Sequence, residues 1–165
     1  MKIRRTTLND LEHLLTLFEG ARAFMRQTGN HQQWNQGYPS VEILKNDIET
    51  GQSYVVCHEN DDIIGTLMFH IGEDHTYRVI DGKWLNDEPY GVIHRIASNQ
   101  KVKGIGQFVF DWALQQCPNL RIDTHQDNQV MRNLLMKEGF IECGIIYLEN
   151  KEPRIAYHKV KKEST

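Results

Sequence analysis

The stretch from Val92 to Phe110 constrains the fold of this chain more than any other. It begins with an apolar run, continues through a polar, basic loop and ends on two glycines, Gly104 and Gly106, that lead into an amphipathic segment. This pattern predicts a strand, a glycine loop and a helix. Such a loop can direct backbone N–H groups and a helix N-terminus toward an anion, most often a phosphate. We therefore expect a phosphate-bearing ligand at this loop.

Two well-known phosphate loops do not fit the stretch. The sequence Gly-x-x-x-x-Gly-Lys-Ser/Thr does not occur, which excludes a P-loop. Val109 stands where the dinucleotide fingerprint requires its third glycine, which argues against a Rossmann domain.

Residues 101–106 instead resemble motif A of the GNAT superfamily of N-acetyltransferases, which reads Gln/Arg-x-x-Gly-x-Gly/Ala after a strand. The chain departs from the motif at Lys101, in a shorter turn and in the absence of the usual proline. The resemblance implies that backbone amides here hold the pyrophosphate and pantetheine of acetyl-CoA. The predicted cofactor-binding residues of this stretch are Ile96, Ala97, Ser98, Lys101, Val102, Lys103, Gly104, Ile105, Gly106 and Gln107.

Residues 128–140 resemble the next element of the superfamily, Asn-x-x-Ala-x-x-Leu-Tyr-x-x-x-Gly-Phe. Met131 replaces the alanine, and Leu135 replaces the tyrosine that commonly protonates the CoA thiolate. The resemblance implies that Asn128 contacts the cofactor, and a plain helix N-cap is a compatible role. The positions that agree with the pattern are Asn128, Leu134, Gly139 and Phe140.

Hydrophobic periodicity and turn residues predict an order of elements that also matches the GNAT fold. We expect an α/β protein with a strongly twisted, mixed sheet of six to seven strands and helices on both faces. One domain is expected over residues 1–160, followed by a charged tail at 161–165. The predicted strands are 2–5, 53–57, 63–69, 92–98, 120–124, 141–148 and 154–159, and the predicted helices are 11–28, 41–50, 106–116 and 128–137.

Two segments outside these elements are candidates for contact with the acceptor. The loop at 30–40 holds Trp34 and Tyr38, which either fill the core or, as the resemblance implies, form a wall of the acceptor pocket together with Arg95. Residues 73–90 are longer than the usual link between these strands, with Asp81-Gly82 as a turn. We interpret them as an inserted flap near the acceptor site or a dimer contact.

Acetyl transfer from a thioester to an amine requires a base, and His94 is the first candidate. It precedes Ile96 by two residues on a strand, so the two side chains and Ser98 are expected on one face. His94 could instead be a packed structural histidine, or could orient a substrate carboxylate with Arg95. The weaker rivals for the base are His70, Glu73 and Asp74.

The general acid is less defined, because Leu135 occupies the position of the usual tyrosine. Tyr147 and His125 are the substitutes that the sequence offers, although a tyrosine in a strand is most often a core residue. A thiolate with a pKa of about 8.5 can also leave without an acid.

Composition excludes several other classes. A net charge of −3 and a pI near 6.2 argue against general nucleic-acid binding. No apolar run suits a membrane helix, and the first five residues lack the core of a signal peptide. Three cysteines without metal-type spacing indicate reduced thiols and a cytoplasmic protein, and the histidines show no metal-ligand spacing, so no metal is expected.

We expect an N-acetyltransferase that moves acetyl from acetyl-CoA to a primary amine of a small molecule or peptide, by direct attack in a ternary complex. The family also makes a homodimer a reasonable expectation. The alternative is a non-catalytic acyl-CoA-binding or interaction module on the same fold, which Leu135 and Lys101 favour. A nucleotide-binding protein ranks third. The identity of the acceptor stays open, because a fold does not determine a substrate.

Overall fold

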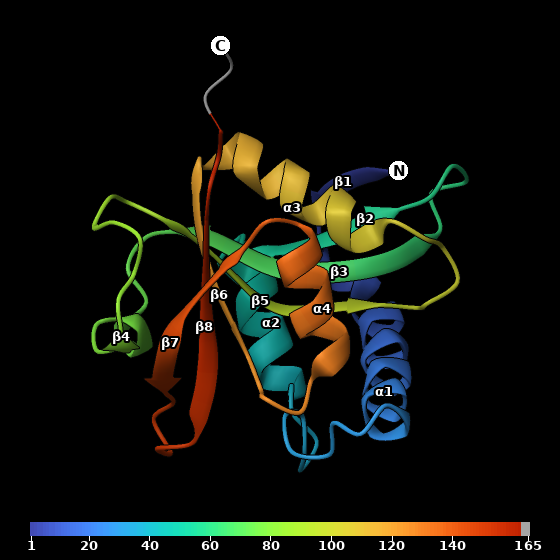
Figure 1. Cartoon of the computed structure of the whole chain (residues 1–165). Coiled ribbons are helices and arrows are strands. Elements are labelled where there is room, and N and C mark those ends of the chain that lie inside the picture. The colour runs from blue at the N-terminus through green and yellow to red at the C-terminus, as the bar shows by residue number, and fades with distance from the viewer. Residues whose placement is uncertain (163–165) are drawn as a thin grey trace.

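The structure is a computed structural model that describes residues 1–162, so the last part of the expected tail, 163–165, lies outside the described residues. Figure 1 shows a central sheet with helices packed on both of its sides. The strands are β1 (Lys2–Arg5), β2 (Ser53–Cys57), β3 (Ile63–Ile71), β4 (Asp81–Gly82), β5 (Gly91–Ser98), β6 (Asn119–Thr124), β7 (Ile141–Tyr147) and β8 (Pro153–Val160). The helices are α1 (Leu11–Gln27), α2 (Val41–Glu49), α3 (Ile105–Gln116) and α4 (Gln129–Lys137), with short 3₁₀ turns η1 (Leu8–Asp10) and η2 (His75–Tyr77).

The eight strands form one mixed sheet in the order β1-β2-β3-β5-β6-β8-β7-β4. The α/β class and the mixed sheet are confirmed, and the eighth strand is the two-residue β4. The sequence predicted a turn at Asp81-Gly82, which is wrong, because these residues pair with Ile145 and Gly144 of β7. A Cβ at Gly82 would lie 2.1 Å from the Cys143 carbonyl oxygen, so glycine permits the close approach of the two backbones.

Two layers of helices cover the sheet. α1 buries Leu14, Leu17, Phe18 and Ala21 at helical spacing, and together with Leu44 of α2 these side chains pack on Val55 and Ala97 of the sheet. Helix α2 begins at Ser40, whose hydroxyl accepts from the Ile43 N–H at 3.2 Å. On the other face, α3 and α4 enclose the larger core around Phe110, Leu135 and Phe140.

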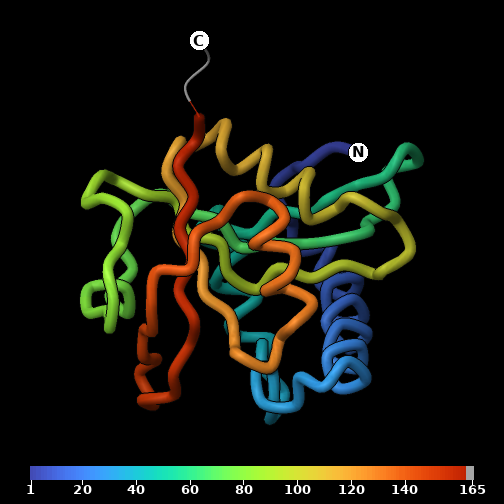
Figure 2. Tube along the Cα trace, viewed as in Figure 1, coloured from blue at the N-terminus to red at the C-terminus, as the bar shows by residue number. Residues whose placement is uncertain are grey.

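The sheet opens in its centre. Parallel β5 and β6 pair only at Gly91 with Leu120 and at Val92 with Arg121. Beyond these pairs the two strands diverge, as Figures 1 and 2 show. Backbone groups on the facing edges of the diverging strands are therefore left without a partner strand, and polar groups of this kind can bind a ligand.

A β-bulge in β5 changes which side chains face the opening. Thr66 pairs with Ala97 and Met68 with His94, so one residue of β3 faces two of β5, and Arg95 has a φ of +50°. The prediction that His94 shares a face with Ile96 is wrong for this reason. Ile96 packs toward α3, whereas His94 projects from the opposite face beside Tyr77.

Residues 73–90 form a fixed cover over one end of the sheet. Tyr77, Tyr90 and Trp84 pack on Val92 of β5 and on strands β7 and β8. The guanidinium of Arg121 lies 4.3 Å from the Trp84 ring centroid and 4.1 Å from that of Tyr90, which fixes the cover to β6. The segment ends directly before β5, so it reaches the opening of the sheet from one side.

Candidate active site

The glycine loop presents an uncapped helix N-terminus. Helix α3 begins at Ile105, one residue earlier than predicted, and Gly104 is its N-cap residue, with a φ of +83° and no side-chain cap. Nothing lies within 4 Å of the position that a Cβ on Gly104 would occupy. The first N–H groups of a helix have no partner within the helix, and they carry the positive end of its dipole. This end of α3 therefore suits an anion.

The second glycine has a different role. A Cβ on Gly106 would lie 2.5 Å from Leu134 Cδ2 of α4. Gly106 therefore lets α3 and α4 pack closely, whereas Gly104 supplies the left-handed backbone that opens the helix.

A hollow of about 550 Å³ lies between this loop and the N-terminal half of α1. Ser98 and Lys101 of the predicted cofactor loop line it, together with Thr16 and Gly20 of α1. Its volume is in the range of small-molecule sites. Strand β5 and the loop after it thus border a space large enough for part of a phosphate-bearing ligand.

His94 lies at the point where β5 and β6 separate. Its Nε2 is 2.7 Å from Asp74 Oδ2, in the cover segment. Burial alone would raise the pKa of the Asp74 carboxyl, but the hydrogen bond and charge of His94, with hydrogen bonds from Thr76, hold that pKa well below its ordinary value. Asp74 is therefore a carboxylate that orients the imidazole, and this arrangement leaves Nδ1 facing the opening.

Asp123 faces His94 across the opening. Each residue stands two positions beyond the last paired position of its strand, and His94 Nδ1 is 3.9 Å from Asp123 Oδ1. The Tyr77 hydroxyl donates to the same oxygen at 2.6 Å. Burial, followed by the charge of Asp123, raises the pKa of Tyr77 well above its ordinary value, so Tyr77 stays protonated as a donor. The imidazole is thus flanked by two carboxylates.

Arg95 joins the bulge to α2 and to the loop at 30–40. Its Nε and Nη2 donate to both oxygens of Asp47 at 2.7 and 2.8 Å, and its Nη1 donates to the Tyr38 hydroxyl at 3.0 Å. Burial lowers the pKa of Arg95, but the hydrogen bonds to Asp47 outweigh burial and raise that pKa. The structure therefore brings together Arg95 and Tyr38, while Trp34 packs edge-on against Phe18, with ring centroids 5.4 Å apart.

Asn128 caps α4 and holds the same loop. Its Oδ1 accepts from the Met131 N–H at 3.1 Å, and its Nδ2 donates to Gln33 Oε1 at 3.0 Å. Gln33 Oε1 also accepts from the Thr124 hydroxyl and from Asn30 Nδ2. One amide oxygen thus ties the loop at 30–40 to the end of β6 and the start of α4.

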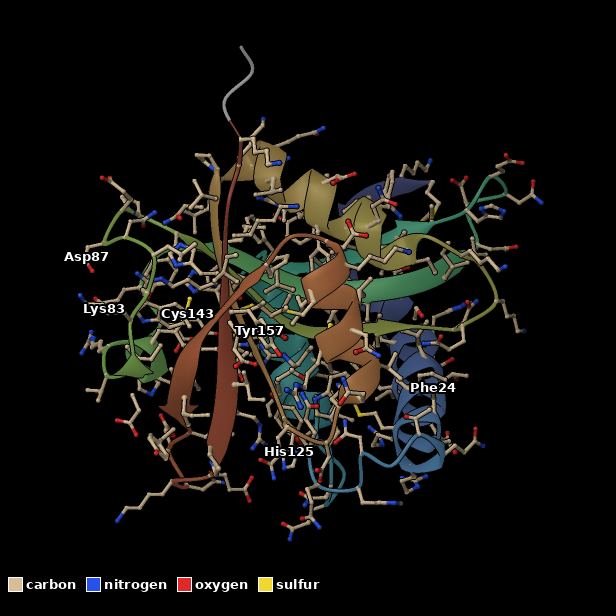
Figure 3. All side chains as sticks on the ribbon, in the orientation of Figure 1. Phe24, Lys83, Asp87, His125, Cys143 and Tyr157 are labelled. Atoms are coloured by element: carbon tan, nitrogen blue, oxygen red, sulfur yellow. The ribbon has the colours of Figure 1, made fainter. Side chains whose placement is uncertain are left out.

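The two candidate acids make no hydrogen bond to His94 among the described residues. Tyr147 is on β7, separated from β6 by β8, and its hydroxyl donates to Asp81 at 2.8 Å. His125 lies in the turn between β6 and α4, as Figure 3 shows, and its Nδ1 accepts from the Asp127 N–H at 3.0 Å. Burial and then the charge of Arg154 lower the pKa of His125, which favours a neutral imidazole. The structure does not bring Tyr147 to the opening.

Several residues of the site were not predicted. Asp74 was named only as a rival base, and it is the partner of His94. Asp123, Tyr77, Asp47 and Gln33 were not named at all. Asp123 could have been found, because it lies near the end of the predicted strand 120–124, and the carboxyl ends of parallel strands lie at one edge of a sheet. Tyr77 and Asp47 carry no such signal.

A sheet that opens beside an uncapped helix N-terminus, with a histidine at the opening, is suited to group transfer from a phosphate-bearing donor. Comparison with known proteins agrees with this class. The profile of the acetyltransferase (GNAT) family matches residues 12–140, and the chain belongs to this family of acetyl-CoA-dependent N-acetyltransferases. No curated protein sequence matches the chain.

Solved structures give the same result. A GNAT-family acetyltransferase from Streptococcus agalactiae is 32% identical, with a TM-score of 0.87 over 98% of this chain and 96% of that one. A Staphylococcus aureus protein provisionally named an acetyltransferase is 26% identical, with a TM-score of 0.71 over 98% and 100%. The ribosomal-protein-alanine N-acetyltransferase of Brucella melitensis, 18% identical, shares the fold with a TM-score of 0.63 over 97% of this chain and 99% of that one.

Two further observations concern the described residues 1–162. None of their helices combines the length and apolar character needed to cross a membrane. No three of their His, Cys, Asp or Glu side chains are grouped in a way that could hold a metal ion.

Proposed function

We propose that this protein transfers acetyl from acetyl-CoA to a primary amine of a small molecule or peptide, by direct attack of the amine within a ternary complex. The observation that carries the proposal is the position of His94. It lies at the opening of the sheet, with Nε2 held by Asp74 at 2.7 Å and Nδ1 directed toward a second carboxylate. A histidine fixed in this way suits a general base.

The donor side of the site fits acetyl-CoA, which supplies an activated acetyl thioester. The open N-terminus of α3 at Gly104 suits its pyrophosphate, and the unpaired edge of β5 from Ile96 to Ser98 suits its amide-containing pantetheine. The N–H groups of that edge can stabilise the negative charge that develops on the carbonyl oxygen. In this proposal the loop residues 101–107 position the donor.

The acceptor side has a negative charge, and an amine arrives mostly as an ammonium ion. Asp123 Oδ1 accepts only from Tyr77 among the described residues, and His94 Nδ1 lies 3.9 Å from the same oxygen. We infer that Asp123 holds the ammonium group while His94 Nδ1 takes one of its protons. Asp74 then stabilises the imidazolium that forms, because it stays ionised beside Nε2.

No side chain is assigned as the acid that protonates the leaving thiolate. Leu135 is fully buried in the core and has no proton to give. The lowered pKa of His125 favours its neutral form. Tyr147 lies on β7, away from the opening, and its hydroxyl donates to Asp81. A thiolate with a pKa of about 8.5 can leave without an acid, and we propose that it does so here, while the second proton of the attacking nitrogen passes to water as the amide forms.

The rival function is an acyl-CoA-binding module without turnover, which Leu135 at the tyrosine position favours. The test is an assay with acetyl-CoA and a panel of primary amines, in which free thiol and acetylated product are both measured. Acetylation of at least one amine, with thiol released in equal amount, is the expected result. Stabilisation of the protein by acetyl-CoA without acetylation of any amine would support the module and overturn the enzyme.

A further inference from the structure

A second hollow, of about 230 Å³, lies between the C-terminal half of α1 and the loop at 30–37. It is separate from the hollow of about 550 Å³ beside residues 98–101, which is lined by the N-terminal half of the same helix. Arg22, Arg26, Asn30 and Trp34 contribute side chains to its wall. The proposed mechanism assigns no role to this hollow.

Asn30 places an unpaired hydrogen-bond acceptor in this wall. The residue is 3% exposed, its N–H donates to the Met25 carbonyl at 2.8 Å, and its Nδ2 donates to Gln33 at 3.0 Å. Its Oδ1 is buried and has no partner among the described residues. Buried acceptors are almost always satisfied by protein, water or a ligand, so this oxygen has the capacity to accept from one further N–H or O–H donor.

The wall is also positively charged. Arg22 Nη1 donates to the Tyr38 carbonyl at 3.3 Å, which holds the loop, whereas the guanidinium of Arg26 makes no hydrogen bond or ion pair with any described residue. No aspartate or glutamate lines the hollow, although the whole chain has a net charge of −3. Arg26 also suits the C-terminus of α1, but that role requires neither a hollow nor the unpaired oxygen of Asn30.

The loop that lines the hollow also borders the opening of the sheet. Gln33 bonds Thr124 at the end of β6, directly after Asp123, and Tyr38 bonds Arg95, directly after His94. An acceptor that occupies the hollow therefore lies along a loop fixed to both strands that carry the proposed reacting groups.

We propose that this hollow is an acceptor subsite for the C-terminal carboxylate of a short peptide. Arg26 and Arg22 bind the carboxylate, Asn30 Oδ1 accepts from the neighbouring peptide N–H, and Trp34 supplies an apolar wall. A guanidinium binds a carboxylate through charge-assisted hydrogen bonds, which neutral donors do not match. The inference rests on the proposed function, because it places the free amine of the same molecule toward His94.

Calorimetric titration tests carboxylate binding apart from turnover. The probes are N-acetyltriglycine and its C-terminal amide, which differ only in the charge of the terminus. The wild type is expected to bind the carboxylate about tenfold more tightly than the amide, since a hydrogen bond to a charged group contributes at least that factor. The preference should disappear in Arg26→Gln and persist in Arg5→Gln, which removes another exposed arginine, at the end of β1.

Steady-state acetylation of triglycine and triglycinamide then separates the two proposals. A KM that is about tenfold lower for triglycine, with the difference lost in Arg26→Gln, supports the subsite. Equal affinity for both termini, or a preference that survives Arg26→Gln, overturns the subsite even when both peptides are acetylated. Tight carboxylate binding without acetylation of any amine overturns the proposed function and leaves a carboxylate site.

Discussion

At the scale of single residues, the two carboxylates beside His94 divide their tasks by position. Asp74 contacts Nε2 directly, whereas Asp123 lies across the opening and keeps one oxygen bonded to Tyr77. The first orients the imidazole and the second gives the opening its negative charge. Neither task could be assigned from the sequence, because the pairing of these side chains depends on how residues 73–90 pack.

Asp123→Asn tests the proposed ammonium contact. The amide keeps an oxygen that can accept from Tyr77 but removes the charge that attracts the amine. We expect the KM for the amine to rise about tenfold, since hydrogen bonds to charged groups contribute about 1.5–3 kcal/mol. Steady-state kinetics measures the change, with Asp111→Asn, an exposed carboxylate on α3, as the control. An unchanged KM would exclude Asp123 from amine binding.

His158 makes stability depend on pH. It is fully buried between the Leu85 N–H and Asn119, and burial, with the charge of Arg121, lowers its pKa from 6.5 to about 4. The unfolded chain therefore binds a proton first as the pH falls. The contribution of neutral His158 to the free energy of unfolding is complete above about pH 6.5. It is lost as the pH falls toward 4, at up to roughly 1.4 kcal/mol per pH unit.

Denaturant unfolding of wild type and His158→Gln at pH 7 and pH 5 checks this prediction. The variant is expected to be less stable at pH 7, because the hydrogen bonds to Leu85 and Asn119 are altered, but to lose less stability on acidification. An equal loss in both proteins would mean that other groups cause the acid sensitivity.

At the scale of elements, the bulge in β5 shows where sequence reasoning stops. The strand itself and its length were predicted from its apolar run. The bulge at Arg95 was not, since no local pattern marks it, and Arg95 pairs there with Asp47, which lies 48 residues earlier on α2. Because the bulge shifts the alternation of side chains, His94 and Arg95 both project toward the α1 and α2 layer, and the site lies on that face.

The N-terminus of α3 is the element on which donor binding depends. Gly104→Asp would place a negative charge at the proposed phosphate site, and we expect it to abolish the increase in Tm that acetyl-CoA causes in the wild type. In the wild type, a ligand at 100 times its Kd adds about 2.7 kcal/mol of stability, a rise of several degrees. Differential scanning fluorimetry measures the rise.

Gly29→Asp is the matched control for this substitution. Gly29 also has a positive φ, of +89°, and has nothing within 4 Å of its Cβ position, but it lies after α1. The substitution Gly29→Asp therefore adds the same charge at a residue that also has a positive φ, but away from the loop before α3. If Gly104→Asp keeps the full increase in Tm caused by acetyl-CoA, or if Gly29→Asp loses it equally, the assignment of the loop before α3 as the phosphate site is contradicted.

At the scale of the whole molecule, α1 lines two hollows, one beside the loop at 98–101 and one beside the loop at 30–37. The opening lies between β5, which leads into the loop at 98–101, and β6. The segment at 30–40 is hydrogen-bonded to both strands. Two motifs and the order of elements were enough to predict the fold, the family and the loop after β5. The acceptor side was not predictable in the same way, since residues 73–90 show no periodicity and are positioned by long-range contacts such as that of Arg121 with Trp84.

The most direct test of the account is the kcat/KM of His94→Gln with acetyl-CoA and the best amine found in the panel. Glutamine preserves a polar side chain but cannot act as the base, so we expect kcat/KM to fall by about 10²–10⁴-fold. The increase in Tm caused by acetyl-CoA should be unchanged, because the donor loop is intact. A variant that retains wild-type kcat/KM would show that His94 is not the base and would contradict the mechanism.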